Sequence, residues 1–138
     1  MEIINHECYV SLEIAKLLKE AGFDWEVNTC RYNSSPDKIS SNGTLTSNFN
    51  GYAFQHIAIS APTLDVAQKW LREVKKYHIY VRPYDLDDGT YVTNIVITDS
   101  RWGSLQDNNK KAIIFKTYEE AQEAGIKKAL EIILEKGE

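Results

Sequence analysis

The sequence predicts an α+β domain, with three helices packed on a small, mainly antiparallel sheet of about five strands. Three stretches combine a helix cap with apolar residues at helical spacing, and β-rich stretches separate them in the order α-β-β-α-β-β-β-α. The chain lacks the regular alternation of strands and helices that a parallel sheet requires. Because 138 residues is an ordinary size for one domain, we expect residues 1–138 to form a single domain.

The first helix is expected between Ser11 and Gly22. Ser11 is a favourable N-cap, and Gly22 can adopt the left-handed conformation that closes a helix. The apolar residues that share one face of this segment are Ile14, Leu17, Leu18 and Ala21. A strand is expected after this helix, at residues 25–32.

A long polar segment follows that strand. Residues 33–51 read NSSPDKISSNGTLTSNFNG and contain almost nothing that can anchor a core. We expect a flexible polar loop at 33–51, either disordered or extended as a hairpin with a turn near Asn42-Gly43. The next strand is expected at residues 52–59.

The second helix is predicted to follow Thr63, because a proline and a threonine cap precede a long apolar stripe. Spacing of this kind gives one wide apolar face, so we expect Trp70 to lie in the core. The predicted stripe consists of Leu64, Ala67, Trp70, Leu71, Val74 and Tyr77.

Two β-rich runs, 78–84 and 90–98, are joined by a short acidic turn that ends in glycine, which predicts an antiparallel pair. Pro83 has no backbone N–H, so we expect it at a sheet edge or near the end of the ladder. After a second turn region at 99–110, residues 111–116 are assigned to the third strand of a meander.

The third helix has the clearest N-terminal signal. Thr117 followed by Glu120 is a capping box, and the helix is expected to run to about Glu135. Gly125 in mid-helix costs about 1 kcal/mol relative to alanine, and close packing on a neighbour would account for it. The predicted buried stripe consists of Tyr118, Ala121, Gly125, Ala129, Ile132 and Ile133.

Residue types that carry chemistry are few and scattered. The histidines and cysteines lack the paired spacing of a metal site: His6, Cys8, Cys30, His56 and His78. The sequence also lacks glycine-rich phosphate-binding motifs. We therefore expect no metal, no cofactor and no catalytic residue, and we expect both cysteines to be reduced thiols.

Charge and hydropathy restrict the partners. A formal net charge of -4 argues against binding nucleic acid by general attraction to phosphate. The densest basic group, Lys69, Arg72, Lys75 and Lys76, is interrupted by Glu73 and is either a solvated helix face or a local basic patch. With no secretion signal and no apolar run long enough to span a bilayer, we expect a cytoplasmic protein without membrane contact.

One group of residues is typical of a partner-binding surface. By strand alternation, Tyr80, Arg82 and Tyr84 share one face, and Arg101 and Trp102 occupy a predicted loop near them. Exposed aromatic residues beside arginine supply buried area and specific hydrogen bonds at modest entropic cost. The alternative is that this face packs beneath a helix.

Three segments carry a resemblance to other proteins: residues 11–25 (SLEIAKLLKEAGFDW), 61–76 (APTLDVAQKWLREVKK) and 117–134 (TYEEAQEAGIKKALEIIL). Together they resemble small uncharacterised proteins of prophages and mobile elements in gut bacteria, in which APT-x-x-x-AQKWLRE and TYEEA-type cores recur. The resemblance covers the three helices only. It implies a genomic setting, but no activity, cofactor or site residue.

These observations favour a non-enzymatic interaction module, an accessory protein of a phage or mobile element that binds a protein partner or a second copy of itself. The first alternative is a protein that binds or processes nucleic acid, motivated by the genomic setting and the basic group. A lesser alternative is a small-molecule enzyme that uses Cys30 or a histidine.

Overall fold

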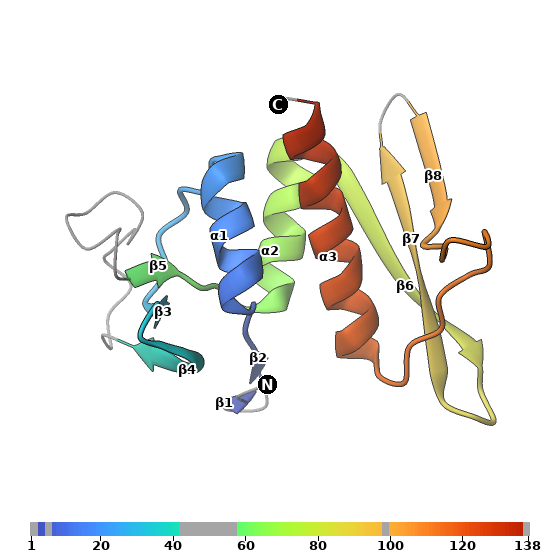
Figure 1. Cartoon of the computed structure of the whole chain (residues 1–138), viewed down its shortest axis with the longest axis horizontal. Coiled ribbons are helices and arrows are strands. Elements are labelled where there is room, and N and C mark those ends of the chain that lie inside the picture. Colours follow the sequence, from blue (N-terminus) through green and yellow to red (C-terminus); the bar gives the residue numbers. More distant parts are fainter. Residues whose placement is uncertain (1–2, 5–6, 42–57, 98–99, 137–138) are drawn as a thin grey trace. The chain divides into compact units, whose positions relative to one another are not determined.

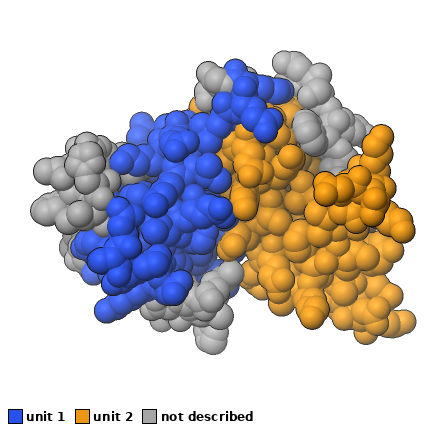
Figure 2. Space-filling model, viewed as in Figure 1, with its two compact units in different colours: residues 1–67, 133–138 blue, residues 68–132 orange. Residues whose placement is uncertain are grey.

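The structure is a computed structural model that describes residues 3–4, 7–41, 58–97 and 100–136, with backbone alone at 3–4, 7 and 100–104. The chain divides into two compact units (Figure 2): residues 1–67 with 133–138, and residues 68–132. The predicted α+β class and the order α-β-β-α-β-β-β-α are confirmed, with β1, β2 and β4 as additional strands. The strands form separate antiparallel sheets.

The first unit contains helix α1, Leu12–Ala21, with the predicted caps. The Ser11 hydroxyl accepts a hydrogen bond from the backbone N–H of Ile14, and Gly22 is left-handed with φ 98°. The helix contacts a three-stranded sheet of order β4-β3-β5. Its strands are β3 Thr29–Tyr32, β4 Ser35–Ser41 and β5 Ala58–Ser60, and a small hairpin of β1 Ile3–Ile4 and β2 Glu7–Cys8 precedes α1.

Strand β4 lies inside the segment predicted as a polar loop. Buried Arg31 on β3 helps to hold it, because its Nη1 donates to the carbonyl oxygen of Pro36 at 2.9 Å. The Arg31 Nε donates to the carbonyl oxygen of Val10 at 2.7 Å. Polar residues thus form a strand here through pairing with β3, which local propensity does not report. The predicted turn near Asn42-Gly43 lies outside the described residues.

The second unit contains a three-stranded antiparallel sheet of order β6-β7-β8, with helix α3 beside it (Figure 1). The strands are β6 Tyr77–Asp85, β7 Thr90–Ile97 and β8 Ser100–Ser104. Helix α2, Leu64–Trp70, starts in the first unit and continues into the second as a π-helical turn, Leu71–Lys75. Helix α3, Tyr118–Glu135, has its last residues in the first unit.

The meander is confirmed, but its third strand was assigned to the wrong residues. Strand β8, Ser100–Ser104, pairs with β7, whereas 111–116 contributes only isolated bridges, Ala112 to Gln106 and Phe115 to Tyr91. The segment SRWGS has no β-branched residue, so its pairing with β7 decides its conformation against its propensity.

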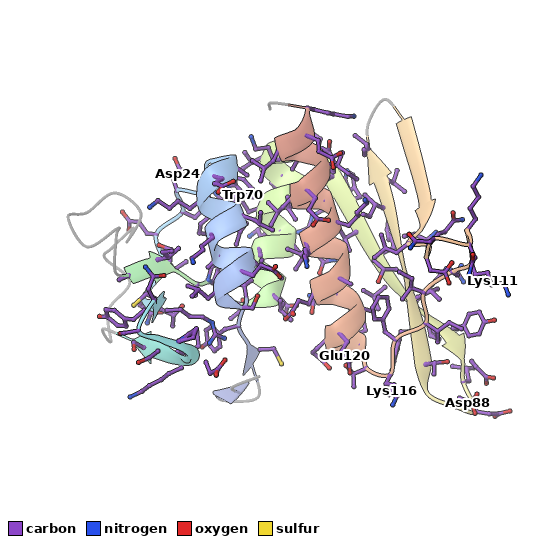
Figure 3. All side chains as sticks on the ribbon, viewed as in Figure 1. Asp24, Trp70, Asp88, Lys111, Lys116 and Glu120 are labelled. Carbon is purple, nitrogen blue, oxygen red and sulfur yellow. The ribbon has the colours of Figure 1, made fainter. Side chains whose placement is uncertain are left out.

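Helix α3 begins at the predicted cap. The Thr117 hydroxyl accepts a hydrogen bond from the backbone N–H of Glu120 at 3.0 Å and donates to the Glu120 carboxylate at 3.3 Å. The Glu120 carboxylate is therefore hydrogen-bonded to the Thr117 hydroxyl and not to the Thr117 backbone N–H. Glu120 lies in the first turn of α3 (Figure 3). None of the described helices is both long enough and apolar enough to cross a membrane.

Gly125 confirms the expected close packing of α3. A Cβ at this position would lie 2.6 Å from Thr93 Cγ2 and 2.8 Å from Ile79 Cγ2. The Thr93 hydroxyl donates to the carbonyl oxygen of Ala121 at 2.6 Å, which ties the sheet to the same helix. The glycine thus allows α3 to approach β6 and β7 directly.

Two residues of the predicted apolar stripes are exposed, and a third, Leu17, is half-buried. Val74 is 48% exposed, because it lies in the π-helical turn, where the helical spacing assumed for the stripe no longer holds. Tyr118 is 41% exposed at the start of α3, where its ring packs edge-on against that of Tyr91 with the ring centroids 5.9 Å apart. Trp70, expected in the core, is 1% exposed.

Candidate functional site

The two faces of β6 have opposite surroundings. Ile79 is buried against α3 at Gly125, whereas Tyr80 and Tyr84 are 54% and 57% exposed. Arg82, which shares the face of Tyr80 by strand alternation, is also exposed. We call Tyr80, Arg82 and Tyr84 the outer face of β6. In the residues that the structure describes, α3 covers the other face of this strand.

Arg82 is oriented along this face by a neighbour. Its Nε donates to the Asn94 side-chain oxygen at 3.1 Å, and Asn94 is the β7 residue paired with Tyr80. Val92, the β7 residue paired with Arg82, is 1% exposed. The exposed aromatic surface is therefore confined to β6 and does not continue onto the middle strand.

The turn at the end of the outer face is held by hydrogen bonds to the carboxylate and the carbonyl oxygen of Asp85. The Asp85 carboxylate accepts hydrogen bonds from the backbone N–H groups of Asp87 at 2.9 Å and Asp88 at 3.4 Å. Gly89 has φ 67° and donates its N–H to the Asp85 carbonyl at 2.9 Å. The predicted acidic turn, with Asp88 at its tip (Figure 3), therefore ends the strand at Asp85, directly after Tyr84.

Arg101 and Trp102 do not lie on a loop beside these residues. Both are in β8, where Arg101 pairs with Val96 and Trp102 with Ile95. Since β7 lies between β6 and β8, the two residues are separated from the outer face of β6 by one strand. Their side chains lie outside the description. Of the five predicted residues, Tyr80, Arg82 and Tyr84 are those whose side chains the structure describes, all three exposed on β6, with Tyr84 where the register with β7 shifts.

Strand β6 is also an edge strand, because among the described residues it pairs only with β7. One of its outward groups has a partner, the Ile79 carbonyl, which accepts a hydrogen bond from Gln68 Nε2 at 2.9 Å. The Gln68 side-chain oxygen in turn accepts from Gln122 Nε2 at 2.7 Å. Two glutamines from the helical segments thus cover one position of the edge.

The hydrogen-bonding pattern shows which backbone groups face outward. Tyr91 exchanges both backbone hydrogen bonds with Phe115, on the side of β7 away from β6, at 2.9 and 2.8 Å. Its β6 partner Pro83 therefore belongs to a pair without backbone hydrogen bonds, and its lack of an N–H disturbs nothing. This confirms the predicted edge position of Pro83. By alternation, the N–H and C=O of Val81 and the N–H of Ile79 also point to the open edge.

A cavity of about 310 Å³ lies along this edge. Part of its wall comes from the middle of β6 and part from the helical segments. Its lining residues are Gln68, Arg72, His78, Ile79, Tyr80, Val81 and Tyr118.

The basic group is engaged in local contacts. The Glu73 Oε2 atom lies 3.9 Å from Lys69 Nζ and 3.8 Å from Arg72 Nη2. The Glu73 backbone carbonyl oxygen accepts a hydrogen bond from Lys76 Nζ at 2.9 Å. The Lys75 ammonium lies 5.7 Å from the centroid of the Trp70 ring. These contacts are those of a solvated helix face whose charges are partly balanced.

The candidate chemical groups, Cys30 and the histidines, belong to different parts of the chain. Burial raises the pKa of the Cys30 thiol, opposed by a hydrogen bond with the Tyr32 side chain. Cys30 belongs to the first unit and His78 to the second, while His6 and His56 lie outside the described residues. In the described part of the chain, no group of three or more His, Cys, Asp or Glu residues is placed to hold a metal ion.

Compared with models of protein families, with curated proteins and with solved structures, the chain matches none of them. The geometry of the molecule therefore carries the functional argument. Sequence reasoning found the outer face of β6 by alternation but missed the cavity and the glutamine pair, since both depend on which strand forms the edge. The signal that pointed to that edge was Pro83.

Proposed function

We propose that this chain is a non-enzymatic interaction module that binds a protein partner through β6. The observation that carries the proposal is the outer face of β6, where Tyr80 and Tyr84 are more than half exposed on either side of Arg82. Tyrosine and arginine are the residue types that dominate binding energy at protein interfaces. In the free protein, they expose apolar ring surface that a partner would remove from water.

The setting of the module is part of the same proposal. The resemblance of the helical segments to proteins of prophages and mobile elements favours an accessory role in such an element. Neither alternative function gains a specific observation: the basic group is partly balanced by Glu73, and the Cys30 thiol is buried within its own unit. The interaction module is therefore the function that the geometry favours.

Site-specific photo-crosslinking tests the proposal directly. A photoreactive phenylalanine analogue is placed at Tyr84, and the matched control carries it at Leu86, which is 84% exposed in the adjoining turn. We expect irradiation in native cells to give a discrete crosslinked species from the first position and none from the second. Alanine at Tyr80 and Arg82 should abolish that species.

Two results would contradict this function. Crosslinking that is equal from both positions would mean that the outer face of β6 is no more engaged than any exposed surface. A species that survives the Tyr80→Ala and Arg82→Ala substitutions would mean that the contact does not depend on the residues proposed to make it.

A further inference from the structure

We propose that the partner of β6 is a second copy of this chain, paired antiparallel to it about a two-fold axis at Val81. This inference rests on the proposed function and names its partner. The two three-stranded sheets of the second units would then join edge to edge into one continuous sheet. The argument comes from the pattern of donors, acceptors and side chains along Ile79 to Pro83.

The backbone groups of the edge are self-complementary in this register. With Val81 opposite Val81 of the second copy, each N–H donates to the other carbonyl, because both groups of Val81 face outward. The next bonded pair, two residues away, places Ile79 opposite Pro83 of the second copy. The outward N–H of Ile79 then donates to that proline's carbonyl.

The remaining two positions match as well. An ordinary residue opposite Ile79 would offer an N–H to the Ile79 carbonyl, but Pro83 has none. That carbonyl already accepts from Gln68 Nε2 at 2.9 Å within its own chain. In the two-fold arrangement, Pro83, which has no N–H to donate, therefore lies opposite the Ile79 carbonyl, which needs no further donor. No buried backbone group between Ile79 and Pro83 is left without a partner.

The side chains agree with the same register. Cross-strand partners share a face, so Pro83 of the second copy lies on the helix-facing side of Ile79, beside the 310 Å³ cavity that Ile79, Val81 and Tyr118 help to line. On the outer face, Tyr80 of each copy lies opposite Arg82 of the other in a close, non-hydrogen-bonded pair. Arginine over a tyrosine ring is an attractive contact, and the symmetry makes it twice.

A different extended peptide is the competing occupant. Such a strand would bring an N–H opposite the Ile79 carbonyl, in competition with Gln68, unless it too carried proline at that place. The chain itself supplies the proline and the arginine at the required spacing, which favours a second copy. Because pairing involves a short stretch of each chain, we expect a weak, concentration-dependent dimer.

Sedimentation equilibrium of the full chain, with Val81→Pro as the disrupting variant, tests this pairing. Val81 donates no backbone hydrogen bond to β7, so proline should leave the monomer folded while it removes two symmetry-related bonds between copies. We expect the dissociation constant to rise roughly ten-fold or more. The matched control, Val81→Thr, keeps both the N–H and the β-branched shape and should dimerise like the natural chain.

Charge exchange tests the register and does not depend on proline. Tyr80→Lys sets the introduced lysine against Arg82 of the second copy and should weaken the dimer. Adding Arg82→Glu in the same chain places opposite charges across the axis and should restore it. If Tyr80→Lys and Arg82→Glu each weaken the dimer when made alone, and the double variant does not restore it, the register is wrong.

The outcomes separate this inference from the function on which it rests. A dimer unaffected by Val81→Pro and by Tyr80→Lys overturns the pairing, as does a natural chain that stays monomeric at every concentration. In the latter case, a crosslink from position 84 to a different protein would leave the interaction module standing. Absence of both the dimer and the crosslink would overturn the two proposals together.

Discussion

Replacing Gly125 with alanine tests whether α3 depends on direct contact with the sheet. The added methyl group would lie 2.6 Å from Thr93 Cγ2 and 2.8 Å from Ile79 Cγ2, whereas carbon atoms prefer about 3.5–4.0 Å. Both neighbours are β-branched and therefore stiff at χ1. Rotating Thr93 would also break its buried hydrogen bond to the Ala121 carbonyl, at 2.6 Å.

The magnitude follows from two opposing effects. Alanine in a helix interior is favoured over glycine by about 1 kcal/mol, while overpacking a core typically costs about 1–3 kcal/mol. Because neither methyl group can move away at low cost, we expect the overpacking to dominate. The Gly125→Ala variant should be less stable than the natural chain by about 1–2 kcal/mol.

Urea unfolding followed by circular dichroism measures this difference from the transition midpoint at an unchanged slope. Thr93→Ser removes the closer methyl group and keeps the hydroxyl, so it should cost less in the Gly125→Ala background than in the natural chain. Ala124→Gly, one residue away, reports the propensity cost alone. A Gly125→Ala variant that is as stable as the natural chain, or more stable, would refute the close contact between α3 and the sheet.

Three further predictions concern single side chains. Thr117→Ala removes the cap of α3 and should lower the free energy of unfolding in urea by about 1 kcal/mol, whereas Thr117→Ser should be nearly neutral. Arg31→Lys cannot reproduce the two hydrogen bonds from the guanidinium to the carbonyl oxygens of Val10 and Pro36, so it should lower the free energy of unfolding by about 1.5–3 kcal/mol in the same assay. An unchanged urea midpoint would contradict the role given to Arg31. In a Cys8→Ser variant, iodoacetamide should modify Cys30 with a pH midpoint above that of the same chain unfolded in urea, because burial raises the pKa of the thiol. The raised pKa favours the folded state at pH values below the pKa of the unfolded thiol, and this advantage is lost as the pH rises through the pKa of the folded one. Equal midpoints for the folded and the unfolded chain would show that burial does not control the thiol.

The helices were predictable because their signals are local. Ser11, Gly22 and Thr117 act within one turn of the residues they cap, so short sequence patterns are enough to place these helix ends. The packing at Gly125 was predictable for a similar reason, since glycine in mid-helix needs a compensating contact. Where the local period changed, at the π-helical turn, the prediction that Val74 is buried was wrong.

The strands show the limit of such reasoning. Residues 35–41 and 100–104 form strands because β3 and β7 offer them backbone partners, and neither segment has a sequence typical of a strand. Residues 111–116, rich in apolar side chains, make only isolated bridges. Pairing between distant segments decides these cases, and the sequence of one segment does not contain that information.

The sequence predicted which residues of the candidate site share a face, but not what surrounds them. Strand alternation predicts that Tyr80, Arg82 and Tyr84 share one face, but it does not predict the register shift between Pro83 and Asp85. Which face a helix covers depends on the packing of α3. Pro83 indicated an edge, yet the bond from Gln68 to the Ile79 carbonyl joins an α-helix to a strand and leaves no pattern in the sequence. Arg101 and Trp102 stay a prediction, since their side chains lie outside the described residues.

Amide hydrogen exchange at Val81, followed by NMR at several protein concentrations, tests most directly the claim that the open edge of β6 is the binding surface. Exchange at Val81 should be fast in dilute solution and slow as the concentration rises, because its N–H becomes bonded to the second copy. The Tyr80 amide, which faces β7, should be protected throughout and serves as the internal control. Exchange at Val81 that is independent of concentration would contradict the account.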